Sequence, residues 1–344
     1  MSYERGLQAI NLKMPDKIPH TEYVTHPRWV QKVTGLDPDN PEQAAQAGVR
    51  FCEALDFDLM WINYSPPDQK RLTHMGTAHW YEGMEVTDNR DYRFKSEEEV
   101  LSFDPVKEFG VPDVSELARR YQECHDRDQA TYPFAVCPGG FYNTIFSWCI
   151  LTFGWEMFLS AAVRDPERFD RVLEGFFEIS LASYRAQAQT TIKAFISHDD
   201  IVWTAGAVFH PNWYRKYVFP RHRKLWAPLR EKGIKLLFCS DGNFTEFIDD
   251  LVEAGADGFI FEPTTDLEYM ASKYGQTHVM IGNIDCRILA HGTREHIEAE
   301  VKRCADIGRN CPGYFFAVGN HIPHDVPVEN ADYYIELINR YGRR

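Results

Sequence analysis

Short apolar runs alternate with longer amphipathic segments along most of this chain. Eight runs rich in aliphatic, β-branched and aromatic residues are expected to form strands: residues 18–24, 57–64, 134–138, 194–198, 234–239, 257–262, 278–283 and 314–319. Several of them, such as residues 234–238, are apolar almost throughout, which is typical of parallel strands that are covered on both faces.

Helical segments are expected between these strands, at residues 166–185, 212–231, 245–254 and 293–307. Pro166 opens the first of them, Thr293 is placed to cap the last, and glycines follow three of the four. Because strands and helices alternate, the sheet should be parallel, and eight strands predict a closed barrel. The fold class is therefore α/β, with residues 1–344 forming a single (β/α)8 TIM barrel.

One connection is too long for a simple crossover between neighbouring strands. Residues 65–133 separate the second and third predicted strands. They contain a hairpin-like stretch at residues 78–87 and a charged helix near residues 96–102. We expect this segment to be an insertion that caps the mouth of the barrel.

The composition excludes several classes of function. The net charge is −14 and no cluster of Lys and Arg offsets it, so no nucleic-acid partner is expected. No run of 18 apolar residues occurs and the first 18 residues are rich in charge, which predicts a cytoplasmic protein without membrane contact. The eight cysteines form no Cys-x-x-Cys pair, and most should be small core residues.

Polar residues gather just after the predicted strands, where the reactive groups of a (β/α)8 barrel lie. They occupy residues 197–200, 239–243, 262, 282–285 and 319–323. Because the carboxyl ends of the strands meet at one face of a barrel, these side chains are expected to share a pocket.

Three segments near the C-terminus resemble the uroporphyrinogen decarboxylase superfamily. They are Gly282-Asn283-Ile284-Asp285, Gly319-Asn320-His321-Ile322-Pro323 and Val326-Pro327-Val328-Glu329-Asn330, and the resemblance covers residues 190–340. The N-terminal half matches only through residues 15–19. The true porphyrinogen decarboxylases of the superfamily carry an Arg-Gln-Ala-Gly-Arg motif that grips substrate carboxylates. Residues 25–50 offer only Arg28 and Arg50, so this chain lacks that clamp.

The other branch that the sequence resembles is the zinc methyltransferases that work with corrinoid proteins. Their His-x-Cys-Gly motif, acidic residue and final Cys correspond here to Cys239, Asp241, Glu262 and Asn320, so most ligand identities differ. Zinc accepts sulfur, nitrogen and carboxylate oxygen, and Cys239, Glu262 and His321 offer one of each, with Asp241 as a fourth ligand or a replacement. The alternatives are that Cys239 packs in the core, Asp241 caps a helix and His321 binds a backbone carbonyl.

Other strand-end residues are candidates for contact with a substrate. His198 or Asp199 would orient the substrate or supply a proton. The alternative is that His198 packs in the core and Asp200 caps the following segment. An aromatic-lined pocket favours a flat, apolar substrate. The candidate substrate-binding residues are Trp61, Tyr64, Phe141, Tyr142, Trp203, Asn283 and Asn320. For each aromatic ring the alternative is a place in the core.

Together these features predict a zinc-dependent methyltransferase of the aryl methyl ether O-demethylase type. It would move a methyl group from a small aromatic donor to a corrinoid carried by a separate partner protein, because no cobalamin-binding Asp-x-His-x-x-Gly run is present. The alternatives are a metal-free decarboxylase of a small carboxylic acid and a non-catalytic protein that binds a small molecule or a corrinoid. The oligomeric state is left open, with a homodimer as one alternative.

Overall fold

The structure, a computed structural model, describes residues 2–344 except 63–72, 75–77, 82–83, 88–90 and 143. Between residues 73 and 92 it describes the backbone of four short strands only. Tyr64, one of the predicted substrate-binding residues, lies outside the described residues.

Six parallel strands form the central sheet in the order β13–β12–β11–β10–β7–β6. They are β6 (Gly139–Phe141), β7 (Ala194–His198), β10 (Lys235–Ser240), β11 (Gly258–Phe261), β12 (Val279–Ile281) and β13 (Tyr314–Phe315). The last five coincide with predicted strands. The third strand is regular only over the three residues of β6, which directly follow the predicted range 134–138. Within that range, Val136 makes a single bridge to Leu59.

The two N-terminal predicted strands close the sheet into a ring through individual bridges. Leu59 pairs in parallel with Val136, and the Asp58 amide donates to the His20 carbonyl at 2.8 Å. The first predicted strand, residues 18–24, lies next to the second on one side and next to the eighth on the other. There the Phe316 amide donates to the Pro19 carbonyl at 2.8 Å. Farther along, β1 (Val24–Thr25) pairs with β14 (Ile322–Pro323). Hydrogen bonds therefore run round eight strands, and the predicted (β/α)8 barrel is confirmed.

Alternate residues of each strand face the interior of the barrel. The interior cluster contains Leu59, Val136, Ala194, Ile196, Leu237, Cys239, Ile260, Val279, Ile281, Phe315 and Ala317, with Ala9 and Ile10 of α1 (Ser2–Ile10) also belonging to it. Residues of the other parity face the surrounding helices: the Ser197 hydroxyl contacts the Tyr184 hydroxyl at 2.6 Å and the Trp226 indole at 3.0 Å. This period of two decides which strand-end residues reach the barrel mouth.

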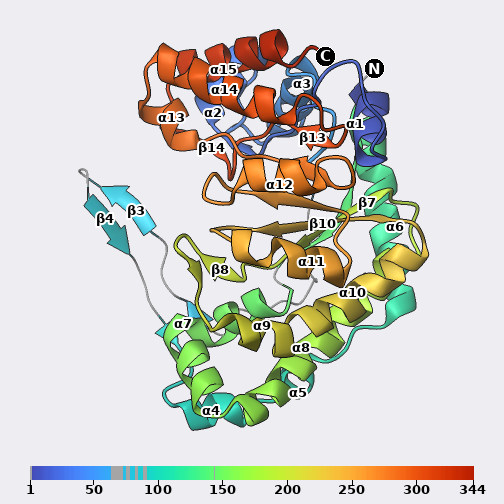
Figure 1. Cartoon of the computed structure of the whole chain (residues 1–344), viewed down its shortest axis with the longest axis vertical. Helices are drawn as coiled ribbons and strands as arrows, with labels where there is room; N and C mark the ends of the chain where they lie inside the picture. Colours follow the sequence, from blue (N-terminus) through green and yellow to red (C-terminus); the bar gives the residue numbers. More distant parts are fainter. Residues whose placement is uncertain (1, 63–72, 75–77, 82–83, 88–90, 143) are drawn as a thin grey trace.

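Helices surround the barrel (Figure 1). They are α2 (Pro27–Thr34), α3 (Ala44–Ala54), α4 (Glu97–Leu101), α5 (Pro105–Phe109), α6 (Val114–Thr131), α7 (Phe146–Arg164), α8 (Pro166–Gln187), α9 (Pro211–Tyr217), α10 (Phe219–Glu231), α11 (Ile248–Ala254), α12 (Leu267–Tyr274), α13 (Cys286–His291), α14 (Arg294–Gly308) and α15 (Val328–Tyr341). Thr293 caps α14 as predicted. The predicted helix 212–231 is divided at Val218, and the helix 245–254 begins with a 3₁₀ turn.

The long connection after the second strand contains the predicted hairpin, formed by β3 (Ala78–Tyr81) and β4 (Met84–Thr87). This hairpin stands out from the body on the same side as β8 (Val202–Trp203), the short strand that follows β7 (Figure 1). The rest of the connection differs from a cap: α6 packs against α8 on the outside of the barrel, away from the hairpin. Of the residues between 65 and 133 that the structure describes, only a part therefore lies on the side of the mouth.

The helix α7 is long and apolar enough to cross a membrane by length and composition. In the fold, 61% of that apolar stretch is buried, and α7 packs against α4 and α8. Its apolar surface is thus explained by a place in the core, although no single run of apolar residues predicted such a helix.

Candidate functional site

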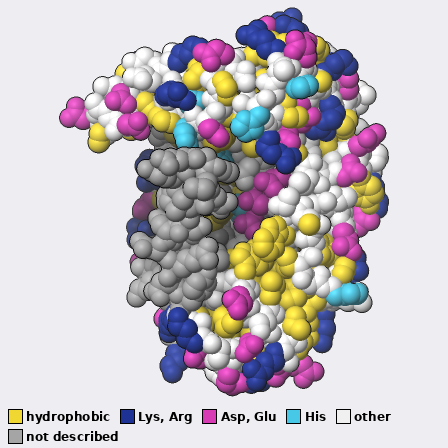
Figure 2. All heavy atoms as spheres, turned by 90° about the vertical axis from the view of Figure 1, so that its left-hand side faces the viewer, with side chains coloured by type: hydrophobic (Ala, Val, Ile, Leu, Met, Phe, Trp, Pro, Cys, Tyr) yellow, Lys and Arg dark blue, Asp and Glu magenta, His cyan; other side chains and the backbone are white. Residues whose placement is uncertain are grey.

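A cavity of about 390 Å³ opens at the carboxyl ends of the strands. It is lined by Tyr23, Trp61, Tyr142, His198, Cys239, Ser240, Asp241, Ile260, Gly319 and Asn320. Figure 2 looks onto this side of the molecule and shows acidic side chains beside a central hollow. No Lys or Arg is among the described lining residues, so the cavity combines aromatic rings with negative charge.

Three potential metal ligands converge at this cavity from two neighbouring strands. His198 ends β7, Asp200 follows it, and Asp241 follows β10. One ligand atom from each lies within 4.8 Å of the other two. His198 Nε2 contacts Asp200 Oδ1 at 3.0 Å, and the same oxygen accepts a hydrogen bond from the Asp241 amide at 3.0 Å. The Asp200 carboxylate therefore links the two loops.

The charges of this group perturb its pKa values in opposite directions. Burial raises the pKa of the Asp241 carboxyl to about 7, and the neighbouring carboxylates Asp200 and Glu262 add to the rise. Burial lowers the pKa of His198, but Asp200 and Asp241 outweigh it and raise the pKa above its ordinary value. Excess negative charge at the end of β10 is a condition that a bound cation would relieve.

The loop after β10 is shaped by a glycine and by the next strand end. Gly242 has φ of +80°, and a Cβ there would lie 2.6 Å from the Trp203 carbonyl oxygen. The Gly242 amide donates to Glu262 Oε2 at 2.7 Å, while Asn320 Nδ2 donates to Glu262 Oε1 at 3.3 Å. Glu262 thus holds the loop that carries Asp241.

The predicted ligand set is not brought together as one group. Among the described residues, the three ligands within reach of one ion are His198, Asp200 and Asp241. Only Asp241 also belongs to the predicted set. Cys239 lies in the cavity wall. Burial raises the pKa of its thiol well above the ordinary value, and the nearby carboxylates of Asp241 and Asp200 add to the rise. His321 Nδ1 contacts Asn320 Oδ1 at 2.6 Å. The Thr245 amide is capped by Asn243 at 3.1 Å, so Asp241 does not serve as that cap.

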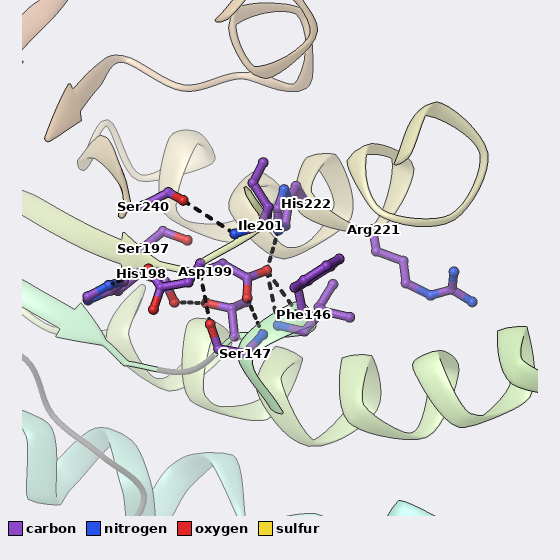
Figure 3. A network of polar contacts seen from close by, with 12 residues as sticks. Phe146, Ser147, Ser197, His198, Asp199, Ile201, Arg221, His222 and Ser240 are labelled. Carbon is purple, nitrogen blue, oxygen red and sulfur yellow. Dashed lines mark hydrogen bonds and ion pairs between the residues drawn. The ribbon is translucent and has the colours of Figure 1, made fainter. Parts of the chain in front are cut away.

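Asp199 is not among the residues that line the cavity, and its side chain points toward the start of α7 (Figure 3). Its side chain is fully buried and accepts hydrogen bonds from the amides of Ile145, Phe146 and Ser147 at 2.8–3.3 Å. His222 Nε2 lies 2.9 Å from Asp199 Oδ2, the oxygen that also accepts the Ile145 and Phe146 amides. The structure therefore gives Asp199 a structural place at the start of α7, and of the two predicted catalytic residues only His198 reaches the cavity.

Of the predicted substrate-binding residues that the structure describes, some line the cavity and others do not. Trp61, Tyr142 and Asn320 line the cavity. Phe141 is buried against Tyr184, and Asn283 Nδ2 donates to the Thr265 carbonyl at 2.9 Å. Trp203 is 57% exposed and stacks on Trp155 with ring centroids 5.4 Å apart, outside the cavity lining.

Sequence reasoning missed Asp200 as a member of the site, together with the lining residues Tyr23, Ser240, Ile260 and Gly319. One signal could have found Asp200. His198 continues the inward parity of Ala194 and Ile196, so the next inward position is 200 and not 199. Tyr23 carries no comparable signal, because the first strand has few regular pairs.

The raised pKa of Asp241 predicts a pH-dependent stability of the metal-free protein. The folded value of about 7 lies above the ordinary value of 3.8, so this group stabilises the fold at low pH and loses that contribution as pH rises from about 4 to 7. We expect Asp241→Asn to gain stability relative to the unaltered chain at pH 8, but not at pH 4. Thermal unfolding in the presence of a chelator measures this difference. Equal shifts at the two pH values would contradict it.

The closed barrel, with its reactive side chains gathered at the carboxyl ends of the strands, defines a barrel enzyme. The family described as Uroporphyrinogen decarboxylase (URO-D) matches residues 38–341, and the chain belongs to that family.

Individual relatives agree with this assignment. A uroporphyrinogen decarboxylase of Syntrophotalea carbinolica is 30% identical over 175 residues, and one of Geobacter sulfurreducens is 32% identical over 153 residues. These matches cover 51% and 44% of this chain, and the chain spans about half the length of the curated relatives it matches.

A solved structure described as a methyltransferase from Methanosarcina mazei matches over nearly the whole chain. The match has a TM-score of 0.67 at 15% identity and covers 99% of this chain and 98% of that one. A putative vitamin-B12 independent methionine synthase from Listeria monocytogenes matches with a TM-score of 0.50 at 10% identity, covering 95% of this chain and 98% of that one. These likenesses show the shared fold.

Proposed function

We propose that this protein is a metal-dependent methyltransferase. It takes a methyl group from a small methylated donor, an aryl methyl ether, and passes it to a corrinoid carried by a partner protein. The observation that carries the proposal is the cavity, which combines a three-residue ligand group with aromatic walls and has no Lys or Arg among its described lining residues. The methyltransferase fold neighbour and the resemblance to the corrinoid-linked branch support it.

The ligand group fits a divalent ion. One imidazole and two carboxylates are a three-ligand set of the kind that catalytic zinc sites use, with a further position left for substrate. His198, Asp200 and Asp241 would hold the ion, in place of the set predicted from sequence. The buried thiol of Cys239, with its raised pKa, would then be part of the wall rather than a ligand. A bound zinc ion supplies Lewis acidity toward an ether oxygen.

The walls of the cavity determine which donors can enter. Three aromatic rings, of Tyr23, Trp61 and Tyr142, offer apolar contact for a flat donor. Asp241 and the adjacent Glu262 disfavour anions, and no Lys or Arg among the described lining residues could pair with the several carboxylates of a porphyrinogen. Uncharged donors fit this environment.

The direction of approach follows from the opening of the cavity. The donor ring would lie against the aromatic wall, with its ether oxygen toward the ligand group and its methyl group toward the mouth. In the proposed reaction the methyl–oxygen bond of the donor would break and its electron pair would stay on the oxygen as phenolate, while the methyl group would leave through the mouth of the cavity to the corrinoid of the partner. Asn320, which donates to Glu262 and Asp241, keeps the rim polar.

An assay with separated components tests this function. The purified chain, loaded with zinc, is incubated with a reduced corrinoid protein and a panel of methoxybenzenes, and the cobalt spectrum and phenol release are followed. We expect methyl-cobalt and phenol to form in equal amounts. If neither forms, and a decarboxylated product appears from a carboxylic acid substrate or a porphyrinogen instead, the chain is a decarboxylase and the proposal is wrong.

A further inference from the structure

The loop after β7 is attached to the segment that leads into α7 at three consecutive residues. Thr144 donates to the His198 carbonyl through both its amide, at 3.1 Å, and its hydroxyl, at 2.8 Å. Asp199 accepts the first amides of α7, as described above. The Asp200 amide donates to the Ser147 hydroxyl at 2.8 Å. All three residues are thereby attached to the start of one helix, His198 and Asp200 through the backbone and Asp199 through its side chain.

A second hydroxyl joins this loop to the one that carries Asp241. Ser240 Oγ accepts a hydrogen bond from the Ile201 amide at 3.3 Å and donates to the Asp241 carbonyl at 2.9 Å. Figure 3 shows Ser147 and Ser240 on either side of the loop. Both side chains are almost fully buried, with 3% and 1% exposed.

We infer that Ser147 and Ser240 are positioning residues for the ligand group, and that their hydroxyls set its affinity for a divalent ion. This inference rests on the proposed function. Neither hydroxyl belongs to the group of ligands, but between them they hold the backbone on both sides of it. Without them, Asp200 Oδ1 would lose the restraint that keeps it against His198 Nε2 and the Asp241 amide.

The expected loss of metal affinity follows from the role of the two hydroxyls as positioning groups. Groups that orient metal ligands without touching the metal change its affinity by about 10- to 100-fold when they are removed. A ligand group held within a few tenths of an ångström by packed neighbours binds more tightly, because less order is imposed when the ion enters. A role confined to stability would leave the affinity of the folded protein unchanged.

The chain offers a matched control for this substitution. Ser180, on α8, is also fully buried, and its hydroxyl has no hydrogen-bond partner among the residues that the structure describes. Ser180→Ala removes the same atom from a buried helix without touching the two loops. Comparison of Ser147→Ala with Ser180→Ala therefore separates positioning from the general loss of a buried hydroxyl.

The experiment is a calorimetric titration of the metal-free, full-length chain with Zn²⁺ alone, alongside urea unfolding of each variant. We expect Ser147→Ala and Ser240→Ala each to weaken zinc binding by about 10- to 100-fold, while Ser180→Ala binds like the unaltered chain. Unchanged affinity in both loop variants would overturn the inference and leave the proposed function standing. If Ser147→Ala does not fold, Ser240→Ala decides alone.

A structural readout separates this inference from the metal proposal itself. If the unaltered chain binds no zinc, the metal part of the proposed function fails, and crystal structures of the metal-free variants still test the positioning. A Ser147→Ala structure in which Asp200 has left His198 Nε2 supports the inference. One in which both contacts of Asp200 Oδ1 are kept overturns it.

Discussion

Substitution of Asp241 by asparagine is expected to remove most bound metal and to lower methyl transfer by about 100-fold or more. The change keeps the shape of the side chain but replaces a charged ligand by a neutral amide. A Lewis acid contributes several kcal/mol to such a reaction, and each 1.36 kcal/mol corresponds to a factor of ten in rate. Elemental analysis after dialysis, together with the transfer assay, measures both effects.

The matched variant for this prediction is Cys239→Ala. Cys239 lines the same cavity two residues earlier, near the end of β10, but it is not one of the three ligands within reach of one ion. We expect it to keep its metal, with activity lowered much less. Loss of metal from Cys239→Ala together with retention in Asp241→Asn would favour the ligand set inferred from the sequence.

The second large effect is expected on stability, from Asp199→Ala. Removal of this fully buried carboxylate leaves His222 and three backbone amides, those of Ile145 and of the first two residues of α7, without their acceptor. Breaking a buried ionic or hydrogen-bonded pair by removing one partner costs about 3–5 kcal/mol. Urea unfolding of the metal-free protein should show a decrease of this order in the free energy of unfolding.

Asp113→Ala provides the control for Asp199→Ala. Asp113 also accepts an amide at a helix start, that of Glu116 at 2.8 Å, but it is exposed to solvent. Loss of an exposed cap costs about 0.5–2 kcal/mol. Equal losses in the two variants would mean that burial adds nothing at Asp199, and that its network is not the anchor described here.

Much of the fold could be predicted because apolar runs and helix signals recur along the chain. The strands at residues 194–198 and 234–239 and the helix capped by Thr293 needed only the hydrophobic pattern and local capping chemistry. The regular part of the third strand was misplaced because Gly139 and Gly140 carry no strand signal of their own. Gly139 is there because a Cβ would lie 2.5 Å from Gln187 Oε1.

The site was harder to predict than the fold. Strand ends identified the face of the barrel on which His198 and Asp241 meet. The choice between Asp199 and Asp200 depended on strand parity, which the sequence did contain. The failure of Cys239, Glu262 and His321 to form one group depends on hydrogen bonds between loops, such as that from the Gly242 amide to Glu262, which no sequence pattern specifies.

Anomalous diffraction from a crystal of the zinc-loaded protein tests the central claim most directly. The account predicts one strong anomalous peak in the cavity, within ligand distance of His198, Asp200 and Asp241, and no such peak in the Asp241→Asn crystal. A peak held instead by Cys239, Glu262 and His321, or no peak in the cavity at saturating zinc, would contradict it.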